Sequence, residues 1–165
     1  MTRIALLIAL ALAIPTAALA TTAPEAAKAP QRNIVGTAAA AGSFTTLLTL
    51  AKQAGLVGAL SGPGKLTVFA PTDAAFKKVP KATLAKLGQD RALLRRVLLY
   101  HVVKGSVPAA KVVGLRSAKT LAGPSVRIRV TGKTVRVNTA RVVKADVKAT
   151  NGIIHVVDRV LIPPA

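Results

Sequence analysis

LTVFAPTDAAF, residues 66–76, predicts a β-strand that leads directly into a helix. Leu66–Phe69 is a short run of β-favouring residues that ends at Ala70-Pro71. Thr72 stands where a helix N-cap is expected, with its hydroxyl available to a free backbone N–H. Asp73 follows in the first turn, where a negative charge suits the helix dipole. The segment carries no nucleophile, phosphate loop or metal-ligand cluster, so it predicts scaffold rather than a catalytic site.

A second apolar segment, NGIIHVVDRVLIP, occupies residues 151–163. Asn151-Gly152 predicts a two-residue hairpin turn, because both residue types tolerate a positive φ. The strand expected after it, Ile153–Val157, is almost wholly apolar and stops at Asp158. We expect the Asp158 carboxylate to bind backbone in the turn after this strand.

Together, the two segments resemble the signature boxes of the fasciclin domain family. The first box is matched by Thr67–Thr72 and Ala75-Phe76, and the second by Asn151-Gly152, Ile154-His155, Asp158 and Val160-Leu161. Between them, Leu98–Val103 (LLYHVV) is similar to the central Tyr-His segment of the family. The resemblance implies an α+β fold with N-terminal helices packed on a twisted, mostly antiparallel β-sheet or β-wedge. It also implies a secreted or cell-surface module for adhesion or interaction, without enzymatic activity.

The N-terminus predicts a signal peptide over residues 1–20. Arg3 supplies a positive charge, Ile4–Ile14 is apolar, and Ala18-Leu19-Ala20 fits a cleavage site. A membrane anchor is the alternative interpretation, although a spanning helix needs about 20 apolar residues. We therefore expect a flexible leader over residues 21–32, a fasciclin-like domain over residues 33–164, and a secreted or periplasmic protein after cleavage near Ala20.

The composition limits how the domain is stabilised. Hydrophobic residues make up 52% of the 165 residues, but the aromatic residues are only three Phe and one Tyr. The core must therefore be built mainly from Val, Leu, Ile and Ala. Cysteine is absent, so disulfides and thiolate metal sites are excluded.

Apolar periodicity and capping residues predict helices mainly in the first half of the chain. The expected helices are Ser43–Gly55, a short turn at Leu56–Leu60, Thr72–Lys77, Lys81–Leu87 closed by Gly88, and Arg91–Leu99 with Asp90 as its N-cap. The remainder, Val102–Ile162, is expected to form strands and turns.

The chain is strongly basic, with 24 Lys and Arg against 5 Asp and Glu and a formal net charge of +19. Removal of the expected signal peptide takes away only Arg3. A field of one sign attracts polyanions and is screened by salt. The resemblance to the fasciclin family does not explain this charge.

The most informative basic stretch is SVRIRVTGKTVRVN, residues 125–138, which alternates on both sides of an expected Gly132-Lys133 turn. The expected buried face holds Val126, Ile128, Val130, Val135 and Val137. The expected outer face holds Arg127, Arg129, Thr131, Thr134, Arg136 and Asn138. In this register Arg129 lies directly opposite Arg136, and like charges in that position weaken strand pairing.

Two interpretations of this arginine-bearing hairpin stay open. In the first, it is a solvated face whose charges prevent edge-to-edge pairing. In the second, it docks an anionic polymer, because guanidinium groups make paired hydrogen bonds to sulfate, phosphate and carboxylate. The predicted polyanion-binding residues are Arg127, Arg129, Lys133 and Arg136, joined by Arg141, Lys144 and Lys148 if their strand lies beside the hairpin.

The expected partners are anionic polysaccharide, lipopolysaccharide, extracellular-matrix polymers or surface proteins. Sequence-specific binding of nucleic acid is not expected, since no helix-turn-helix, zinc or RNA-recognition pattern is present and aromatic stacking residues are nearly absent.

No catalytic or metal-binding pattern stands out. His101 and His155 have no second histidine or carboxylate at ligand spacing, and each is expected to be a core residue. No serine has the context of a nucleophile elbow. We expect no enzymatic activity, no metal and no cofactor.

The resemblance implies two further functions. Tyr100-His101 matches the region that is implicated in integrin binding in animal members, which makes it an adhesion-motif candidate, although the same residues equally suit core packing. Some secreted members resemble carriers of carotenoids or lipids. That alternative requires an exposed aliphatic groove, expected between the sheet and the N-terminal helices.

Overall fold

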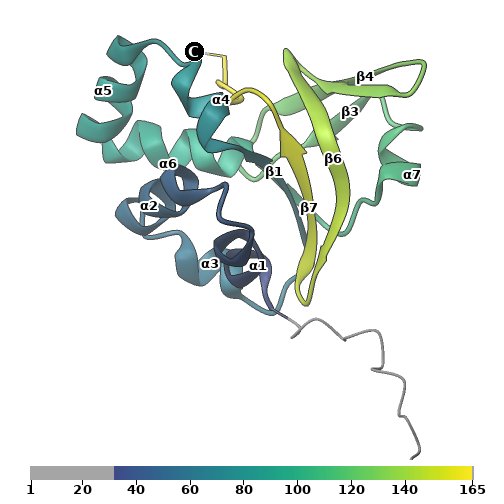
Figure 1. The fold of residues 1–165 in the computed structure, drawn as a ribbon, viewed down its shortest axis with the longest axis horizontal. Coiled ribbons are helices and arrows are strands. Elements are labelled where there is room, and N and C mark those ends of the chain that lie inside the picture. Colours follow the sequence, from purple (N-terminus) through teal and green to yellow (C-terminus); the bar gives the residue numbers. More distant parts are fainter. Residues whose placement is uncertain (1–31, 165) are drawn as a thin grey trace, which may run out of the picture. The chain divides into compact units, whose positions relative to one another are not determined.

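The computed structural model describes residues 32–164, which form seven helices and seven strands (Figure 1). The helices are α1 (Ile34–Ala41), α2 (Thr45–Gln53), α3 (Val57–Ser61), α4 (Asp73–Lys77), α5 (Lys81–Gln89), α6 (Arg91–Tyr100) and α7 (Ala109–Val112). The strands are β1 (Leu66–Pro71), β2 (Val102–Lys104), β3 (Ser117–Lys119), β4 (Ser125–Thr131), β5 (Thr134–Val137), β6 (Ala140–Ala149) and β7 (Gly152–Val157).

Helices α1, α4 and α6 begin at a polar N-cap side chain that accepts a hydrogen bond from a free backbone N–H group. Thr72 Oγ1 accepts from Ala75 N at 3.2 Å, and Asp90 Oδ1 accepts from Leu93 N at 3.0 Å. Both predicted N-caps are confirmed. Asn33 caps α1 in the same way, accepting from Gly36 N at 2.8 Å. The sequence did not predict α1, because its run of small residues has little apolar periodicity.

Helix α5 corrects one predicted boundary. Gly88 was expected to close this helix, yet α5 continues through it to Gln89. The N–H of Asp90 still bonds to Lys86 O at 2.8 Å, so the same aspartate ends α5 and caps α6. A glycine without a positive φ does not stop a helix when the backbone hydrogen bonds continue past it.

The strands form one sheet in the order β2-β1-β7-β6-β5-β4-β3. All neighbouring pairs are antiparallel except β1 and β7, which are parallel, so the predicted mostly antiparallel α+β fold is confirmed. The outer strands β2 and β3 meet at an isolated bridge between Val103 and Thr120, and Leu121 N donates to Val102 O at 2.8 Å. The sheet is therefore curled into a nearly closed barrel.

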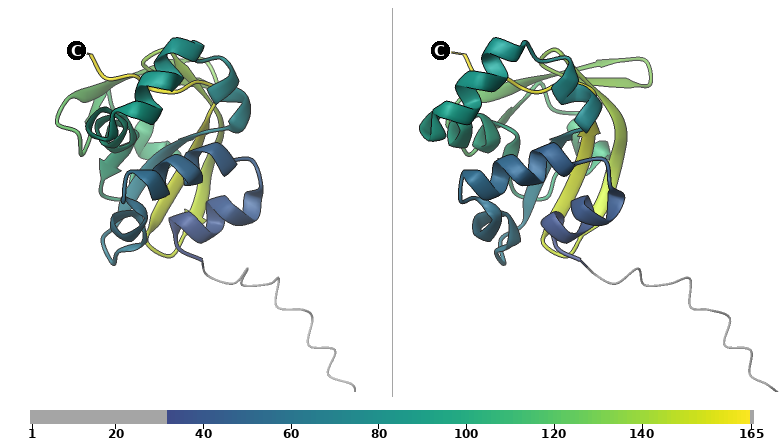
Figure 2. Two further views of the ribbon diagram at one scale, coloured as in Figure 1. Left: turned by 90° about the vertical axis from the view of Figure 1, so that its left-hand side faces the viewer. Right: turned by 60° about the vertical axis from the view of Figure 1, so that its left-hand side comes forward.

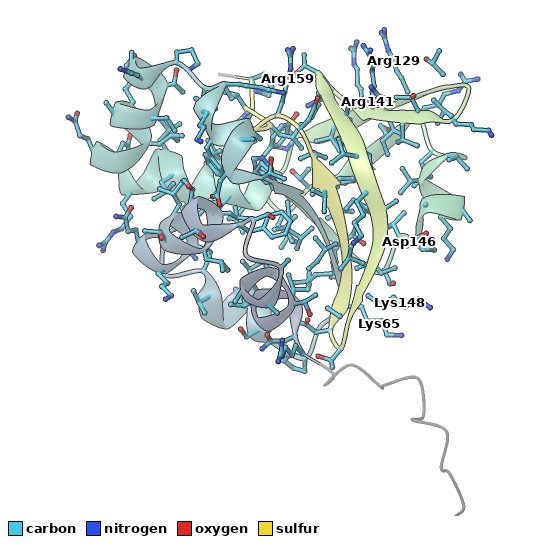
Figure 3. The ribbon with its side chains drawn as sticks, in the orientation of Figure 1. Lys65, Arg129, Arg141, Asp146, Lys148 and Arg159 are labelled. Carbon is cyan, nitrogen blue, oxygen red and sulfur yellow. The ribbon has the colours of Figure 1, made fainter. Side chains whose placement is uncertain are left out.

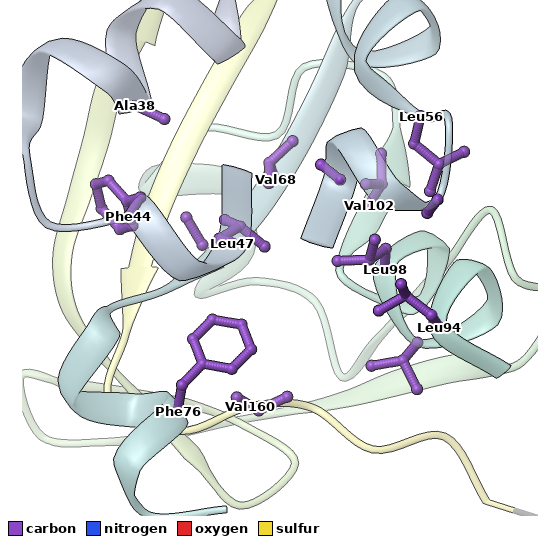
Figure 4. Packing of buried hydrophobic residues seen from close by; sticks show 14 of the residues in the cluster. Ala38, Phe44, Leu47, Leu56, Val68, Phe76, Leu94, Leu98, Val102 and Val160 are labelled. Atoms are coloured by element: carbon purple, nitrogen blue, oxygen red, sulfur yellow. The ribbon is translucent and has the colours of Figure 1, made fainter. Parts of the chain in front are cut away.

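The central strands are buried on both faces, which explains why β1 and β7 are almost continuously apolar. One face packs against the helices through Val68 and Ile154, in the core shown in Figure 4. The other face places Phe69 and Val157 inside the curled sheet, in a second cluster with Tyr100. The period of two along each strand thus divides its residues between two cores.

The Asn151-Gly152 turn prediction is wrong by one residue. Ala149 pairs with Gly152, so the two turn residues are Thr150 and Asn151. The Asn151 side chain is buried: its Oδ1 accepts from Ile34 N at 2.8 Å, and its Nδ2 donates to Leu60 O at 2.6 Å. Asn151 therefore ties α1 and α3 to the start of β7, a long-range role that a local turn pattern does not reveal.

Gly152 is required by close packing rather than by the turn. A Cβ at this position would collide with the carbonyl oxygen of Leu66 in the neighbouring parallel strand. The two strands are paired residue for residue from Leu66 and Gly152 onward. The glycine thus allows β1 and β7 to come together at the start of their ladder.

The predicted signal peptide, and the leader except Arg32, lie outside the described residues. Within residues 32–164, no helix has both the length and the apolar character needed to cross a membrane.

Candidate functional site: a basic face on strands β3 to β6

The paired strands bring three arginines into one row. Arg129 on β4 lies opposite Arg136 on β5, as predicted, and Arg136 lies opposite Arg141 on β6. Directly opposed residues of neighbouring strands project on the same side of a sheet, and strands are about 4.8 Å apart. The three exposed arginines therefore project side by side from the outer surface, across three strands.

Two further basic residues, on β4 and β3, extend the row of arginines. Arg127 lies on the same face of β4, opposite Ser117 of β3. Lys119 also points outward, because its neighbour Ala118 is buried and pairs with the buried Val126. We define the basic face as Lys119, Arg127, Arg129, Arg136 and Arg141. The sequence analysis missed Lys119; the alternation of Ser117-Ala118-Lys119 is a signal that could have indicated it, but three residues are too few to establish a strand.

The three predicted lysines lie outside the row of arginines. Lys133 is exposed at the tip of the β4–β5 hairpin, which projects from the body of the domain (Figure 2). Lys144 opposes Val156 and faces the helix side of the sheet. Lys148 lies with Lys65 and Asp146 far along β6 from Arg141 (Figure 3). Strand β6 does lie beside the hairpin, but it adds only Arg141 to the basic face.

Strand β6 is irregular between Arg141 and Lys148. Its pairing with β7 shifts register between Val142 and Lys144 and again between Lys144 and Val147. Asp146, within the second shift, has a φ of 56°. With regular alternation Lys144, three residues after Arg141, would face the interior of the curled sheet. The extra residue of the first shift returns it to the outer side, but at a part of β6 that lies beside the N-terminal helices and not in the arginine row. A sequence without turn residues in this stretch gives no indication of such bulges.

Two positions of the predicted hairpin also differ. Asn138 has a φ of 53° and does not stay on the arginine face, because its Nδ2 turns back and donates to Tyr100 Oη at 3.0 Å. Val130 was expected to be buried but is 41% exposed, since the end of the hairpin extends past the core.

Arg159 extends the positive charge beyond the sheet. Figure 3 shows Arg159, Arg141 and Arg129 along the same end of the domain. Arg141 N donates to Asp158 Oδ1 at 2.8 Å, which confirms the backbone role expected for Asp158. The Asp158 carboxylate is also 3.9 Å from Lys78 Nζ, the one ion pair found within residues 32–164.

The four aspartates of the described chain all accept hydrogen bonds from backbone donors. Asp90 caps α6, Asp158 binds Arg141 N, and Asp146 accepts from Ala109 N at 2.8 Å. Asp73 accepts from Thr46 N at 2.8 Å, and this N–H donor holds the pKa of Asp73 below its usual value. Each carboxylate keeps its negative charge, but four acids are far fewer than the Lys and Arg residues of the same part of the chain, so the field around the domain stays positive.

Tyr100 and His101 are both internal. Tyr100 is 2% exposed, and its hydroxyl donates to Ser125 O at 3.4 Å. His101 is 1% exposed; Nδ1 donates to Val97 O at 2.7 Å, while Nε2 accepts from Leu161 N at 2.8 Å. These contacts join α6 to β4 and to the C-terminal segment. Neither side chain is accessible to a partner in the folded domain.

The burial of His101 predicts acid sensitivity. Desolvation lowers the pKa of His101 to about 4 from 6.5. The unfolded chain takes up a proton as the pH falls below 6.5, whereas the folded chain does so only near 4. This contribution to stability is therefore complete above pH 6.5 and is lost progressively toward pH 4, by about 3 kcal/mol. Urea unfolding at pH 7 and pH 4.5 measures it, and His101→Gln should show a much smaller loss. An equal loss in both proteins would contradict the assignment.

His155 is also engaged. Its Nε2 lies 2.8 Å from Val107 O, and its Nδ1 accepts from Asp146 N at 3.4 Å. The described residues contain no group of three His, Asp or Glu side chains arranged to hold a metal ion. The histidine and aspartate side chains of this part of the chain thus serve backbone contacts within the fold.

An aliphatic groove does lie between the N-terminal helices and the sheet. It has a volume of about 340 Å³ and is lined by Phe44, Val143, Val147 and Val156, with Lys144 at its wall. This is the place where the carrier alternative required a groove.

The sequence matches the Fasciclin domain family over residues 42–163. The chain belongs to this family. Protein sll1483 of Synechocystis is 41% identical, over 93% of this chain and 91% of its own length. The cell surface glycolipoprotein MPB83 of Mycobacterium bovis is 35% identical, over 87% of this chain and 67% of its own length.

A solved structure has the same fold. It is a FAS1 domain pair from the insect cell adhesion molecule fasciclin I, with a TM-score of 0.60 and 21% identity over 75% of this chain and 47% of that one. The fasciclin fold expected from the signature segments is therefore confirmed, and in this member strands β3 to β6 carry the basic face.

Proposed function

We propose that this fasciclin domain is a non-enzymatic adhesion module at the cell exterior that binds anionic surface polymers through the basic face. One observation carries the proposal: the row formed by Arg129, Arg136 and Arg141. Like charges directly opposed on neighbouring strands destabilise a sheet, so strand pairing itself does not favour this row. An anionic chain laid across the strands would relieve the repulsion and meet each guanidinium in turn.

The chemistry of the row suits sulfate, phosphate and carboxylate groups on a repeating polymer. Guanidinium groups form paired hydrogen bonds with such anions. Acidic polysaccharide and lipopolysaccharide present these groups at the cell surface. The uncompensated charge of the domain adds attraction at longer range, which raises the rate of encounter.

The N-terminal sequence pattern and the similar proteins support an exterior location and an adhesion role. The N-terminal segment has the pattern of a signal peptide. The matched solved structure is that of a cell adhesion molecule, and the relative MPB83 is a cell surface protein. The absence of enzymatic activity is supported by the histidines and aspartates, whose contacts in residues 32–164 all serve the fold.

The groove between α1 and β6 favours a second candidate function, as a carrier of a small apolar ligand such as a carotenoid or lipid. Its aliphatic walls would hold the apolar body, and Lys144 would contact an acidic end. Protein purified from cells that make such compounds should then carry extractable pigment or lipid. A colourless protein without extractable lipid would count against this candidate.

Salt dependence tests the polymer proposal. About three polymer charges bound by the arginine row should release a similar number of counterions, so affinity falls roughly as the third power of salt concentration. A fourfold rise in salt should weaken binding to heparin or to a polyuronate about 60-fold. Titrations at several salt concentrations measure the slope. Affinity that hardly changes with salt would contradict electrostatic binding.

A further inference from the structure

A group of exposed aliphatic side chains lies on a part of the domain that the proposed function does not use. Val113, Leu115 and Leu121 are 48%, 39% and 41% exposed. Val113 and Leu115 follow helix α7, and Leu121 follows strand β3. Figure 1 shows α7 on the opposite side of the sheet from α1 and α2, so those helices do not cover this region.

Leu115 and Leu121 line an open groove along the seam where β2 and β3 meet. We define the seam groove by these two leucines together with Val103, Ala118, Lys104 and Lys119; its volume is about 540 Å³. Few backbone hydrogen bonds cross the seam. An isolated bridge joins Val103 and Thr120, and Leu121 N donates to Val102 O. Val103 and Ala118 are buried and form an apolar floor beneath the exposed leucines.

Basic residues surround these aliphatic side chains without any neighbouring acid in the sequence. Lys104 and Lys119 line the seam groove, and the exposed Lys111 and Arg116 stand near Val113 and Leu115 along the chain. No Asp or Glu occurs between Asp90 and Asp146. The carboxylate of Asp146 is already bonded to Ala109 N at the start of α7.

The combination fits one kind of partner. Aliphatic side chains that enter the acyl boundary, together with basic side chains that contact lipid phosphates, provide the two signals that hold a protein on an anionic membrane. An anionic polymer would use the charges but not the leucines, and a second copy of this chain would bring the same positive charge. We propose that the seam groove and Val113 dock on the surface of an anionic lipid bilayer.

In this arrangement Leu115 and Leu121 enter the boundary between headgroups and acyl chains. The charges of Lys104, Lys111, Arg116 and Lys119 lie at the phosphates. Lys119 also belongs to the basic face, so the two surfaces are neighbours on the domain. Membrane docking nevertheless depends on the leucines, whereas polymer binding depends on the arginine row.

Tryptophan reporters test the insertion directly, because the chain contains no tryptophan. Leu121→Trp places a single reporter at the seam groove, and Ile162→Trp is the matched control at a site that is 51% exposed elsewhere. With phosphatidylglycerol vesicles, we expect the emission of L121W to shift to the blue and to be quenched by brominated acyl chains. The I162W emission should change little. L121W that binds these vesicles without quenching would overturn the proposal.

Paired polar variants give the second measurement. L115N/L121N should reduce partition onto phosphatidylglycerol vesicles at least about tenfold. The control V130N/I162N removes two aliphatic residues that are 41% and 51% exposed on other surfaces, and it should bind as the parent does. Equal partition of both variants would overturn the proposal, as would binding of monomeric lipid without any binding of vesicles. Retention of L115N/L121N on heparin should match the parent, so a failure of membrane docking is distinguishable from a failure of polymer binding.

Discussion

Gly152→Ala should destabilise the domain by about 4 kcal/mol or prevent folding, the largest effect expected for a single methyl group in this chain. The added Cβ would collide with the carbonyl oxygen of Leu66 and also approach its carbonyl carbon and amide nitrogen. These are backbone atoms of a paired strand, so no side-chain rotation relieves the contact. The neighbouring hydrogen bond from Leu66 N to Asn151 O, at 3.0 Å, would be strained as well.

Gly88→Ala is the matched control for this prediction. Gly88 lies within α5, is exposed, and a Cβ there would meet no atom within 4 Å. Alanine is favoured over glycine inside a helix by about 1 kcal/mol, so this variant should be slightly more stable than the parent. Urea unfolding followed by circular dichroism measures both. If G152A unfolds at the parental urea concentration, the close approach of β1 and β7 is not as described.

The local parts of the fold could be predicted from sequence because they depend on neighbouring residues. Thr72 and Asp90 each cap a helix with a hydrogen bond to a residue three positions later, and the Gly132 turn sets the register of the β4–β5 hairpin. Such contacts repeat in a fixed geometry. Helix α1 was not predicted because its small residues show little apolar periodicity, and the contact that holds it, from Ile34 N to the Asn151 side chain, comes from far along the chain.

The candidate site was predictable only along the hairpin. Arg129 and Arg136 follow from alternation around one turn, but the place of Arg141 depends on the pairing of β5 with β6. Lys144 was assigned to the same surface, but it lies farther along β6, on the part of the outer side that borders the N-terminal helices. Alternation is a reliable guide within a regular strand and fails after a bulge, which reverses the faces.

Asn151 shows the opposite kind of error. A residue that favours turns was assigned to local turn chemistry, whereas its amide is buried and bonds to α1 and α3. The sequence contains no sign of this, because the partners are backbone groups. Unlike the caps at Thr72 and Asp90, these partners lie far along the chain, where no local pattern connects them to Asn151.

R129A/R136A/R141A should lower the affinity for an anionic polysaccharide at least about 30-fold, since each guanidinium contact with an anion contributes roughly 1 kcal/mol. The variant should stay folded. Removal of three like charges that oppose one another on neighbouring strands should leave the free energy of unfolding equal or slightly higher. A loss of binding without a loss of stability would exclude unfolding as its cause.

The matched control is R91A/R95A/R96A on helix α6. It removes the same number of charges from exposed positions away from the sheet. Binding governed by total charge alone would weaken equally in both triple variants, whereas binding at the basic face would weaken mainly in the first.

The most direct test of the central claim is therefore a side-by-side measurement of these two triple variants and the parent on one anionic polysaccharide at fixed salt. We predict that R91A/R95A/R96A binds within about threefold of the parent and that R129A/R136A/R141A loses at least about 30-fold. Equal affinities of the two variants would contradict a binding site on strands β3 to β6.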